Sequence, residues 1–194
     1  MRLLLIRHGL TDYNLKSRYC GFRDIDLNKT GKAQGQVIKN KLKKIKIDTV
    51  FCSDLKRSKQ SARIIFGDSR CQIIKNPDLR EINFGRWEGL TFKQILKEYP
   101  FIYKKWLNNP FSADIPDGEK MNCFINRVKK ELKKIIKNNP DKTVALVTHF
   151  GPIRVILNTV LNSKKNDFWR LKINPKAVYV IEYKGRLKYK VYKI

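Results

Sequence analysis

The chain is poor in the residues that build metal sites and covalent cross-links. It holds two histidines in 194 residues, and its four cysteines are far apart and form no CxxC pair: Cys20, Cys52, Cys71 and Cys123. This spacing leaves little material for a structural zinc site. We therefore expect reduced, mostly buried thiols, no metal and no cofactor.

Long hydrophobic runs are also missing. None approaches the roughly 20 apolar residues that a membrane-spanning helix needs, and the first run, Leu3–Ile6, is too short for the core of a signal peptide. The sequence predicts a cytoplasmic protein without a membrane partner. A chain of 194 residues can bury one sizeable core, so we expect a single domain over residues 1–194.

Acidic residues are scarce, with 17 Asp and Glu against 43 Lys and Arg, and the formal net charge is +26. Such a charge attracts anions, including nucleic acids and phosphorylated metabolites. The lysines are scattered over every segment, and aromatic residues do not alternate regularly with them as on a base-stacking surface. We expect a solvated basic surface and no specific nucleic acid, and a nucleic-acid-binding protein stays the remote alternative.

Short apolar runs alternate with segments of helical periodicity. Strands are expected at residues 3–6, 48–52, 71–74 and 144–148, and a closing hairpin over 177–192 that turns around Lys184-Gly185. Helices are expected at about residues 31–46, after Ser53 or Asp54 as a cap, and at 91–99, 121–136 and 152–161. The alternation indicates an α/β three-layer sandwich (α/β/α) with a mostly parallel central sheet.

Two irregular segments interrupt this pattern. Residues 9–27 form a long polar stretch that predicts a loop lining a site. Residues 79–120 contain an irregular stretch with two glycines, short helical stretches and a turn-rich segment at 108–118, and we expect a small, mostly helical cap insertion there. Sites of open α/β sheets lie at the carboxyl ends of the strands, so both segments are placed to cover one.

Both histidines stand at such strand ends. His8 follows the run Leu3–Ile6 and Arg7, and His149 follows Val144–Thr148. An imidazole with an unperturbed pKa of about 6.5 is largely neutral at pH 7 and can attack phosphorus. Arg57 lies early in the helix after the second strand, and arginine forks match phosphoryl oxygens without a metal.

A leaving alkoxide would need a proton from an acid opposite the nucleophile. Glu81 and Glu88 are the candidates, because both lie in the irregular stretch of residues 79–89. Their spacing does not choose between them.

Four segments, in this order along the chain, resemble known motifs: Arg7-His8-Gly9 with Thr11 and Asn14 (RHGxTxxN), residues 53–62 (SxLxRxxQTA), residues 79–89 (LxExxFGxWEG) and residues 147–151 (VxHGG). Together they resemble the histidine phosphatase superfamily, in the branch of phosphoglycerate mutases and small bacterial phosphatases. The resemblance implies that His8 is the nucleophile and becomes a phosphohistidine, and that Glu81 is the proton donor. It also implies phosphoryl- or substrate-binding roles for Arg7, Arg57, His149, Asn14 and Gly21.

Two residues depart from the family pattern. Phe150 stands where the last motif has a glycine directly after the histidine, and it is expected to narrow or cover one wall of the site. Lys120 follows Gly118-Glu119 where relatives often have serine, so a polar contact to substrate is in question there.

The opening motif and the Trp87-Glu88-Gly89 form resemble hydrolases more than mutases. Among the small hydrolases they resemble the α-ribazole phosphatase group, which implies a phosphomonoesterase of the cobalamin pathway acting on a phosphorylated small molecule. A phosphoglycerate mutase is the alternative, a nucleic-acid-binding protein on a degenerate phosphatase fold is the remote one, and both a monomer and a homodimer stay open.

Overall fold

The computed structural model describes residues 1–162, 171, 177–183 and 189–193. One six-stranded sheet has the strand order β3-β2-β4-β1-β5-β6. Its strands are β1 (Arg2–Arg7), β2 (Thr49–Cys52), β3 (Gln72–Lys75), β4 (Thr143–Thr148), β5 (Val178–Tyr183) and β6 (Tyr189–Lys193). The first four are mutually parallel, and β5 and β6 run antiparallel at one edge. The predicted mostly parallel sheet is confirmed; the expected turn around Lys184-Gly185 lies outside the described residues.

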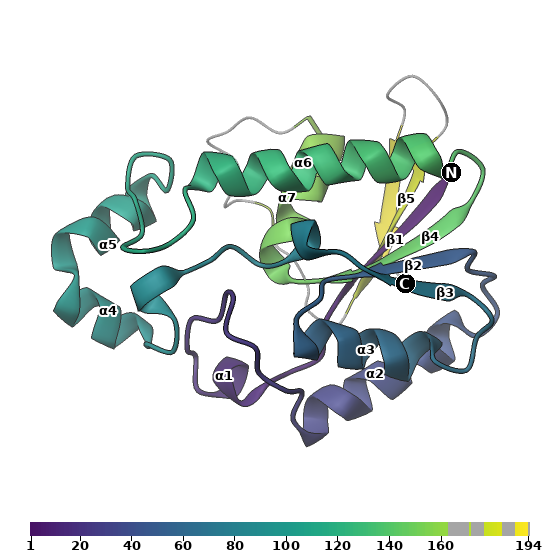
Figure 1. Ribbon diagram of the computed structural model, residues 1–194, viewed down its shortest axis with the longest axis horizontal. Helices are drawn as coiled ribbons and strands as arrows, with labels where there is room; N and C mark the ends of the chain where they lie inside the picture. Colours follow the sequence, from purple (N-terminus) through teal and green to yellow (C-terminus); the bar gives the residue numbers. More distant parts are fainter. Residues whose placement is uncertain (163–170, 172–176, 184–188, 194) are drawn as a thin grey trace.

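Helices cover both faces of the sheet. In Figure 1, α2 (Lys29–Leu42) and α3 (Lys56–Phe66) lie below it and α6 (Met121–Asn138) lies above it. Strand β1 alternates accordingly: Leu4 and Ile6 join the core under α2 and α3, and Leu3 and Leu5 join the core under α6 and α7 (Phe150–Val160). This alternation of buried faces produces the three-layer sandwich that the sequence predicts.

Three expectations about local structure are wrong. Helix α2 ends at Leu42, and α3 begins after Leu55 without a side-chain cap, because the Ser53 hydroxyl accepts from the Leu55 N–H and Asp54 pairs with an arginine. The cysteines are free, but only Cys52 is buried and Cys123 is exposed.

The expected loop of residues 9–27 contains one helical turn, α1 (Asp12–Leu15). Thr11 and Asn14 form a capping box there, in which the Asn14 side-chain oxygen accepts from both the backbone N–H and the hydroxyl of Thr11. This turn fixes the Asn14 side chain directly after the end of β1.

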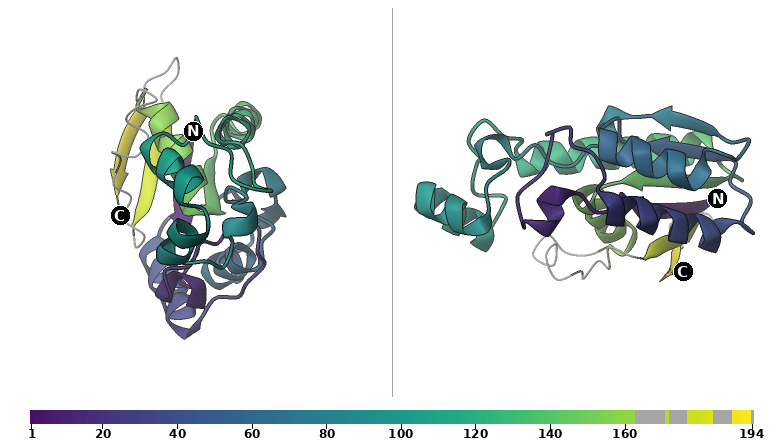
Figure 2. Two further views of the ribbon diagram at one scale, coloured as in Figure 1. Left: turned by 90° about the vertical axis from the view of Figure 1, so that its left-hand side faces the viewer. Right: turned by 90° about the horizontal axis from the view of Figure 1, so that it is seen from below.

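Residues 79–120 leave the sheet at the carboxyl ends of its strands and return to α6 (Figures 1 and 2). Trp87 is fully buried there and packs edge-on against Tyr103 and Trp106, with ring centroids 5.2 and 5.6 Å away. These aromatic contacts fasten the outlying helices to the irregular stretch beside the sheet. The region contains η2 (Gly85–Trp87), α4 (Phe92–Glu98) and α5 (Pro100–Asn108), and η1 (Pro77–Leu79) leads into it from β3.

Candidate active site

Strand pairing brings the two histidines together. Arg7 of β1 pairs with Thr148 of β4, and His8 and His149 are the next residues on these parallel strands. The His8 N–H donates to the Thr148 carbonyl at 2.9 Å, and the two imidazole centroids are 4.9 Å apart. The sheet register alone therefore places both rings at one point of its carboxyl edge.

Arg57 reaches the same edge from the neighbouring strand. Cys52 of β2 pairs with Val147, and the hydroxyl of Ser58 donates to the Val147 carbonyl at 2.6 Å, which fixes the first turn of α3. Arg57 is 1% exposed, and its guanidinium donates to the carbonyls of Gly21 and Arg23 at 2.6 and 2.8 Å. Arg57 thus orders the loop that follows α1 and contributes a fixed cation to the site.

The Glu81 carboxylate lies at the amino end of α7. The Thr148 hydroxyl donates to the Leu79 carbonyl at 2.6 Å and ties this segment to β4. Both Glu81 oxygens accept from the Gly151 N–H, at 3.0 and 3.1 Å. A Cβ at residue 151 would lie 2.0 Å from Glu81 Oε1, so only glycine permits this approach.

Glu88, the other carboxylate candidate, faces the loop instead. Its two oxygens accept from the N–H groups of Phe22 and Arg23, both at 2.6 Å. Gly21 lies between Glu88 and residue 82, where a Cβ would approach the Ile82 carbonyl to 2.2 Å. Glu88 therefore fixes the backbone of residues 22 and 23, and Gly21 lets this loop pack closely against residue 82.

A pocket of about 340 Å³ opens at this edge of the sheet. Six of the eight site residues expected from the sequence line it: Arg7, His8, Asn14, Arg57, Glu81 and Phe150. His149 and Gly21 are not part of this lining: His149 is fully buried with its ring centroid 4.9 Å from that of His8, and the Gly21 carbonyl accepts from Arg57. Arg18 and Tyr19 also line the pocket, and the only sequence signal for them was their place in the long loop.

The two departures from the family pattern have different surroundings. The Phe150 ring lies between two guanidiniums, 5.4 Å from that of Arg7 and 4.5 Å from that of Arg154, and forms a wall of the pocket. Lys120 lies on the surface, where its ammonium is 3.4 Å from Asp114.

Burial favours the neutral form of both histidines. Burial, followed by the neighbouring charges of Arg57 and Arg7, lowers the pKa of His8 well below its ordinary value. Its Nδ1 lies 2.7 Å from the Gly9 carbonyl, so Nδ1 carries the proton and Nε2 has a free lone pair. Burial, with Arg57 as the next cause, also lowers the pKa of His149, and neither of its ring nitrogens meets a hydrogen-bond partner among the described residues.

Glu81 is shifted the opposite way. Burial raises the pKa of its carboxyl, although the N–H groups of Gly151 and Ile82 and the nearby arginines favour the charged form. Burial thus favours the protonated form of Glu81 and the neutral form of His8, the two forms that acid catalysis with a neutral nucleophile uses. Among the described residues, no three His, Cys, Asp or Glu side chains cluster as a metal site would need.

The two depressed pKa values predict acid sensitivity. Below pH of about 6.5 the imidazoles take up protons in the unfolded chain more readily than in the folded protein. As pH decreases, the free energy of unfolding therefore decreases by about 1.4 kcal/mol per pH unit for each proton that only the unfolded chain takes up. We expect the thermal midpoint to drop between pH 7.5 and 5, and to drop less in His149→Asn. Parallel midpoint curves for the two proteins would contradict this origin.

The fold and the pocket define an α/β enzyme whose site presents imidazoles and guanidiniums to an anion. A model of the histidine phosphatase superfamily (branch 1) matches residues 3–192, and the chain belongs to this superfamily and is a phosphatase. No helix in the described part of the chain has the length and apolar character to span a membrane.

Relatives in this superfamily carry several substrate names. The chain is 28% identical to phosphoserine phosphatase 1 of Hydrogenobacter thermophilus, over 96% of this chain and 88% of that protein. It is 27% identical to adenosylcobalamin/alpha-ribazole phosphatase of Escherichia coli, over 90% and 86%. The crystal structure of the alpha-ribazole phosphatase from Shigella flexneri superposes with a TM-score of 0.92 at 26% identity, covering 100% of this chain and 96% of that one.

Proposed function

We propose that the protein is a metal-independent phosphomonoesterase that works through a phosphohistidine on His8. The observation that carries this proposal is one pocket lined by His8, Arg7, Arg57 and Glu81, in which the His8 Nδ1 lies 2.7 Å from the Gly9 carbonyl and burial lowers the pKa of His8 and raises that of Glu81. In this proposal Arg7, Arg57, His149 and Asn14 hold the phosphoryl oxygens. The unpartnered, buried ring nitrogens of His149 support such a role, because buried polar atoms are normally satisfied.

The reaction then has two balanced steps. His8 Nε2 attacks phosphorus, the ester P–O bond breaks, and Glu81 gives its proton to the departing oxygen. Water next loses a proton to the Glu81 carboxylate and attacks the phosphorus, the N–P bond breaks, and inorganic phosphate leaves with His8 and Glu81 restored. Each group returns to its starting protonation state, so no further reactant is needed.

The substrate pocket favours a leaving group with an aromatic or apolar body. A second pocket of about 450 Å³ adjoins the first and shares Tyr19, Glu81, Phe84 and Phe150 with it. Apart from Gly151, the rest of its lining is Ile82, Trp106, Leu107, Met121, Phe124 and Arg154. Residues 79–120 supply five residues of the lining of this second pocket. In this proposal they form a cap inserted into a single domain. Together with relatives named α-ribazole phosphatases, this lining supports α-ribazole 5′-phosphate, whose base is aromatic, or a related metabolite.

A hydrolysis panel in excess chelator tests the activity and the substrate together. We expect turnover of α-ribazole 5′-phosphate with a kcat/KM at least about tenfold above that of phosphoserine, because a mostly apolar pocket pairs poorly with an ammonium and a carboxylate. Leu107→Ser should raise KM for α-ribazole 5′-phosphate and leave p-nitrophenyl phosphate unaffected. Loss of activity in chelator would contradict the metal-independent mechanism, and a preference for phosphoserine would contradict the substrate. Interconversion of the two phosphoglycerates would identify a mutase.

A further inference from the structure

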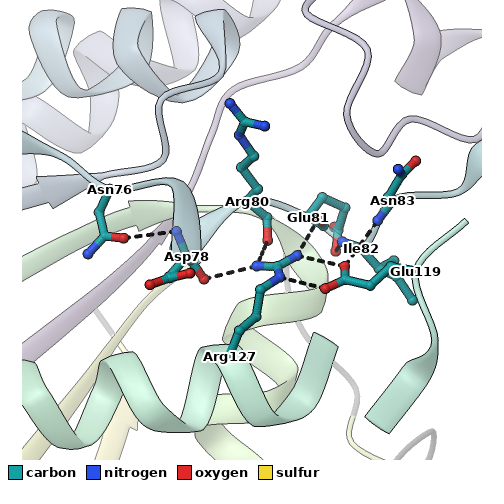
Figure 3. Close-up of polar contacts among 8 residues, drawn as sticks. All are labelled: Asn76, Asp78, Arg80, Glu81, Ile82, Asn83, Glu119 and Arg127. Atoms are coloured by element: carbon teal, nitrogen blue, oxygen red, sulfur yellow. Dashed lines mark hydrogen bonds and ion pairs between the residues drawn. The ribbon is translucent and has the colours of Figure 1, made fainter. Parts of the chain in front are cut away.

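The guanidinium of Arg127, in α6, donates hydrogen bonds to Glu119 and to backbone carbonyls of residues 78–81 (Figure 3). Its Nε and Nη2 donate to the two Glu119 oxygens at 2.7 and 2.8 Å. Nη1 donates to the carbonyls of Asp78 and Arg80 at 2.9 and 3.0 Å, and Nη2 donates to the carbonyl of Glu81 at 2.8 Å. These five bonds equal the five N–H donors of a guanidinium.

Apart from Asp78, which belongs to η1, the stretch that Arg127 binds lies outside regular structure. Residues 80–84 follow η1 and precede η2 without belonging to a helix or strand, so neither a strand ladder nor a helix holds the backbone of Glu81. Glu119 extends the clamp to the other side of Glu81, because its Oε2 accepts from the Asn83 N–H at 3.3 Å and its own N–H donates to the Asn83 carbonyl at 2.9 Å. The Arg127–Glu119 pair thus forms hydrogen bonds with the backbone both before and after Glu81.

This clamp lies outside both pockets described above. Arg127 contributes nothing to their linings, and its side chain and that of Glu119 are 18% and 15% exposed. Its bond to the Glu81 carbonyl fixes the backbone from which the carboxyl projects toward Gly151. Displacement of a catalytic group by about 1 Å can lower a rate about 100-fold.

We propose that Arg127 is a positioning residue for the Glu81 proton donor. The inference rests on the proposed function, since it assigns Arg127 a part in aiming that proton at the leaving oxygen. Lysine cannot substitute, because an ammonium has three donors and no planar fork to bind Glu119 and three carbonyls at once.

The test compares leaving groups in Arg127→Lys. A p-nitrophenolate leaves readily without a proton, whereas phenolate, with a pKa of about 10, benefits from one. We therefore expect kcat/KM for phenyl phosphate to fall by about 10- to 100-fold and that for p-nitrophenyl phosphate by less than about threefold. The ratio kcat/KM is the proper measure, because it covers only the steps up to departure of the alcohol and excludes hydrolysis of the phosphohistidine.

Matched variants separate positioning from general damage. Arg63→Lys, on the exposed side of α3, should leave both substrates unchanged. Glu119→Gln, which removes the charge but keeps a hydrogen-bonding side chain, should show the same leaving-group dependence more weakly and covers the case in which Arg127→Lys folds poorly. Equal losses for both substrates in these variants would overturn the inference. Failure of the wild type to form a phosphohistidine would instead overturn the proposed function.

Discussion

His8→Ala should abolish turnover and leave no phosphoenzyme. The variant removes the Nε2 lone pair of the one imidazole that lines the pocket, and in the proposed mechanism His149 binds a phosphoryl oxygen and does not attack phosphorus. Loss of a nucleophile that acts together with its partners lowers kcat by about 10⁴- to 10⁶-fold in well-studied hydrolases. We expect a loss in this range, measured with p-nitrophenyl phosphate, and no acid-labile phosphate on the quenched protein.

Folding controls make this result interpretable. The pKa of His8 is depressed by burial beside two arginines, so alanine relieves an unfavourable environment and the variant should melt no lower than the wild type at pH 6. Cys123→Ser, at an exposed position of α6, should keep full activity. A folded His8→Ala protein that still forms a phosphoenzyme would place the nucleophile elsewhere.

Glu81→Gln should have the second largest effect, and the effect should depend on the alcohol. Without the proton donor, kcat/KM for phenyl phosphate should fall by about 10²- to 10⁴-fold, and that for p-nitrophenyl phosphate should change little. The kcat for both should fall, because the same carboxyl activates water in the second step. A pre-steady-state burst of p-nitrophenolate should therefore appear in the variant. Uniform losses in kcat/KM for both substrates would contradict the donor role.

The same variant should gain stability at high pH. The pKa of Glu81 is raised in the folded protein, so the native state holds this proton more tightly than the unfolded chain does. The contribution of Glu81 to wild-type stability therefore decreases as pH rises from about 4.5 through its raised pKa, and glutamine avoids this decrease. Glu81→Gln should unfold at a higher denaturant midpoint than the wild type at pH 8, with the difference disappearing near pH 4.

The positions of both histidines followed from the sequence because they depend on local patterns. An apolar run of strand length ends directly before each of them, and parallel pairing brings such ends together. The choice between Glu81 and Glu88 could not be made in this way. It depends on the N–H groups of Phe22, in a loop, and Gly151, at the start of α7, which lie 66 and 70 residues away along the chain.

Two other features could not be predicted from the sequence for related reasons. Arg127 stands among the lysines of α6, and the carbonyls that it binds are 46 to 49 residues earlier, so its local pattern resembles that of any solvated helix face. Asp54 is of a residue type that often caps helices, yet its carboxylate accepts from Arg80 at 2.7 Å. In both cases a long-range arginine contact overrides the local propensity.

Glu81 and Phe150 line both the pocket of the arginines and the apolar pocket, and in the proposed mechanism this shared wall sets an order of events. An alcohol on the apolar side would cover the oxygen position that Glu81 must reach, and the attacking water would need that same position. The alcohol must therefore depart before water enters, and phosphate leaves last. An enzyme built this way follows ping-pong kinetics, and a second alcohol that enters the vacated side competes with water for the phosphoryl group.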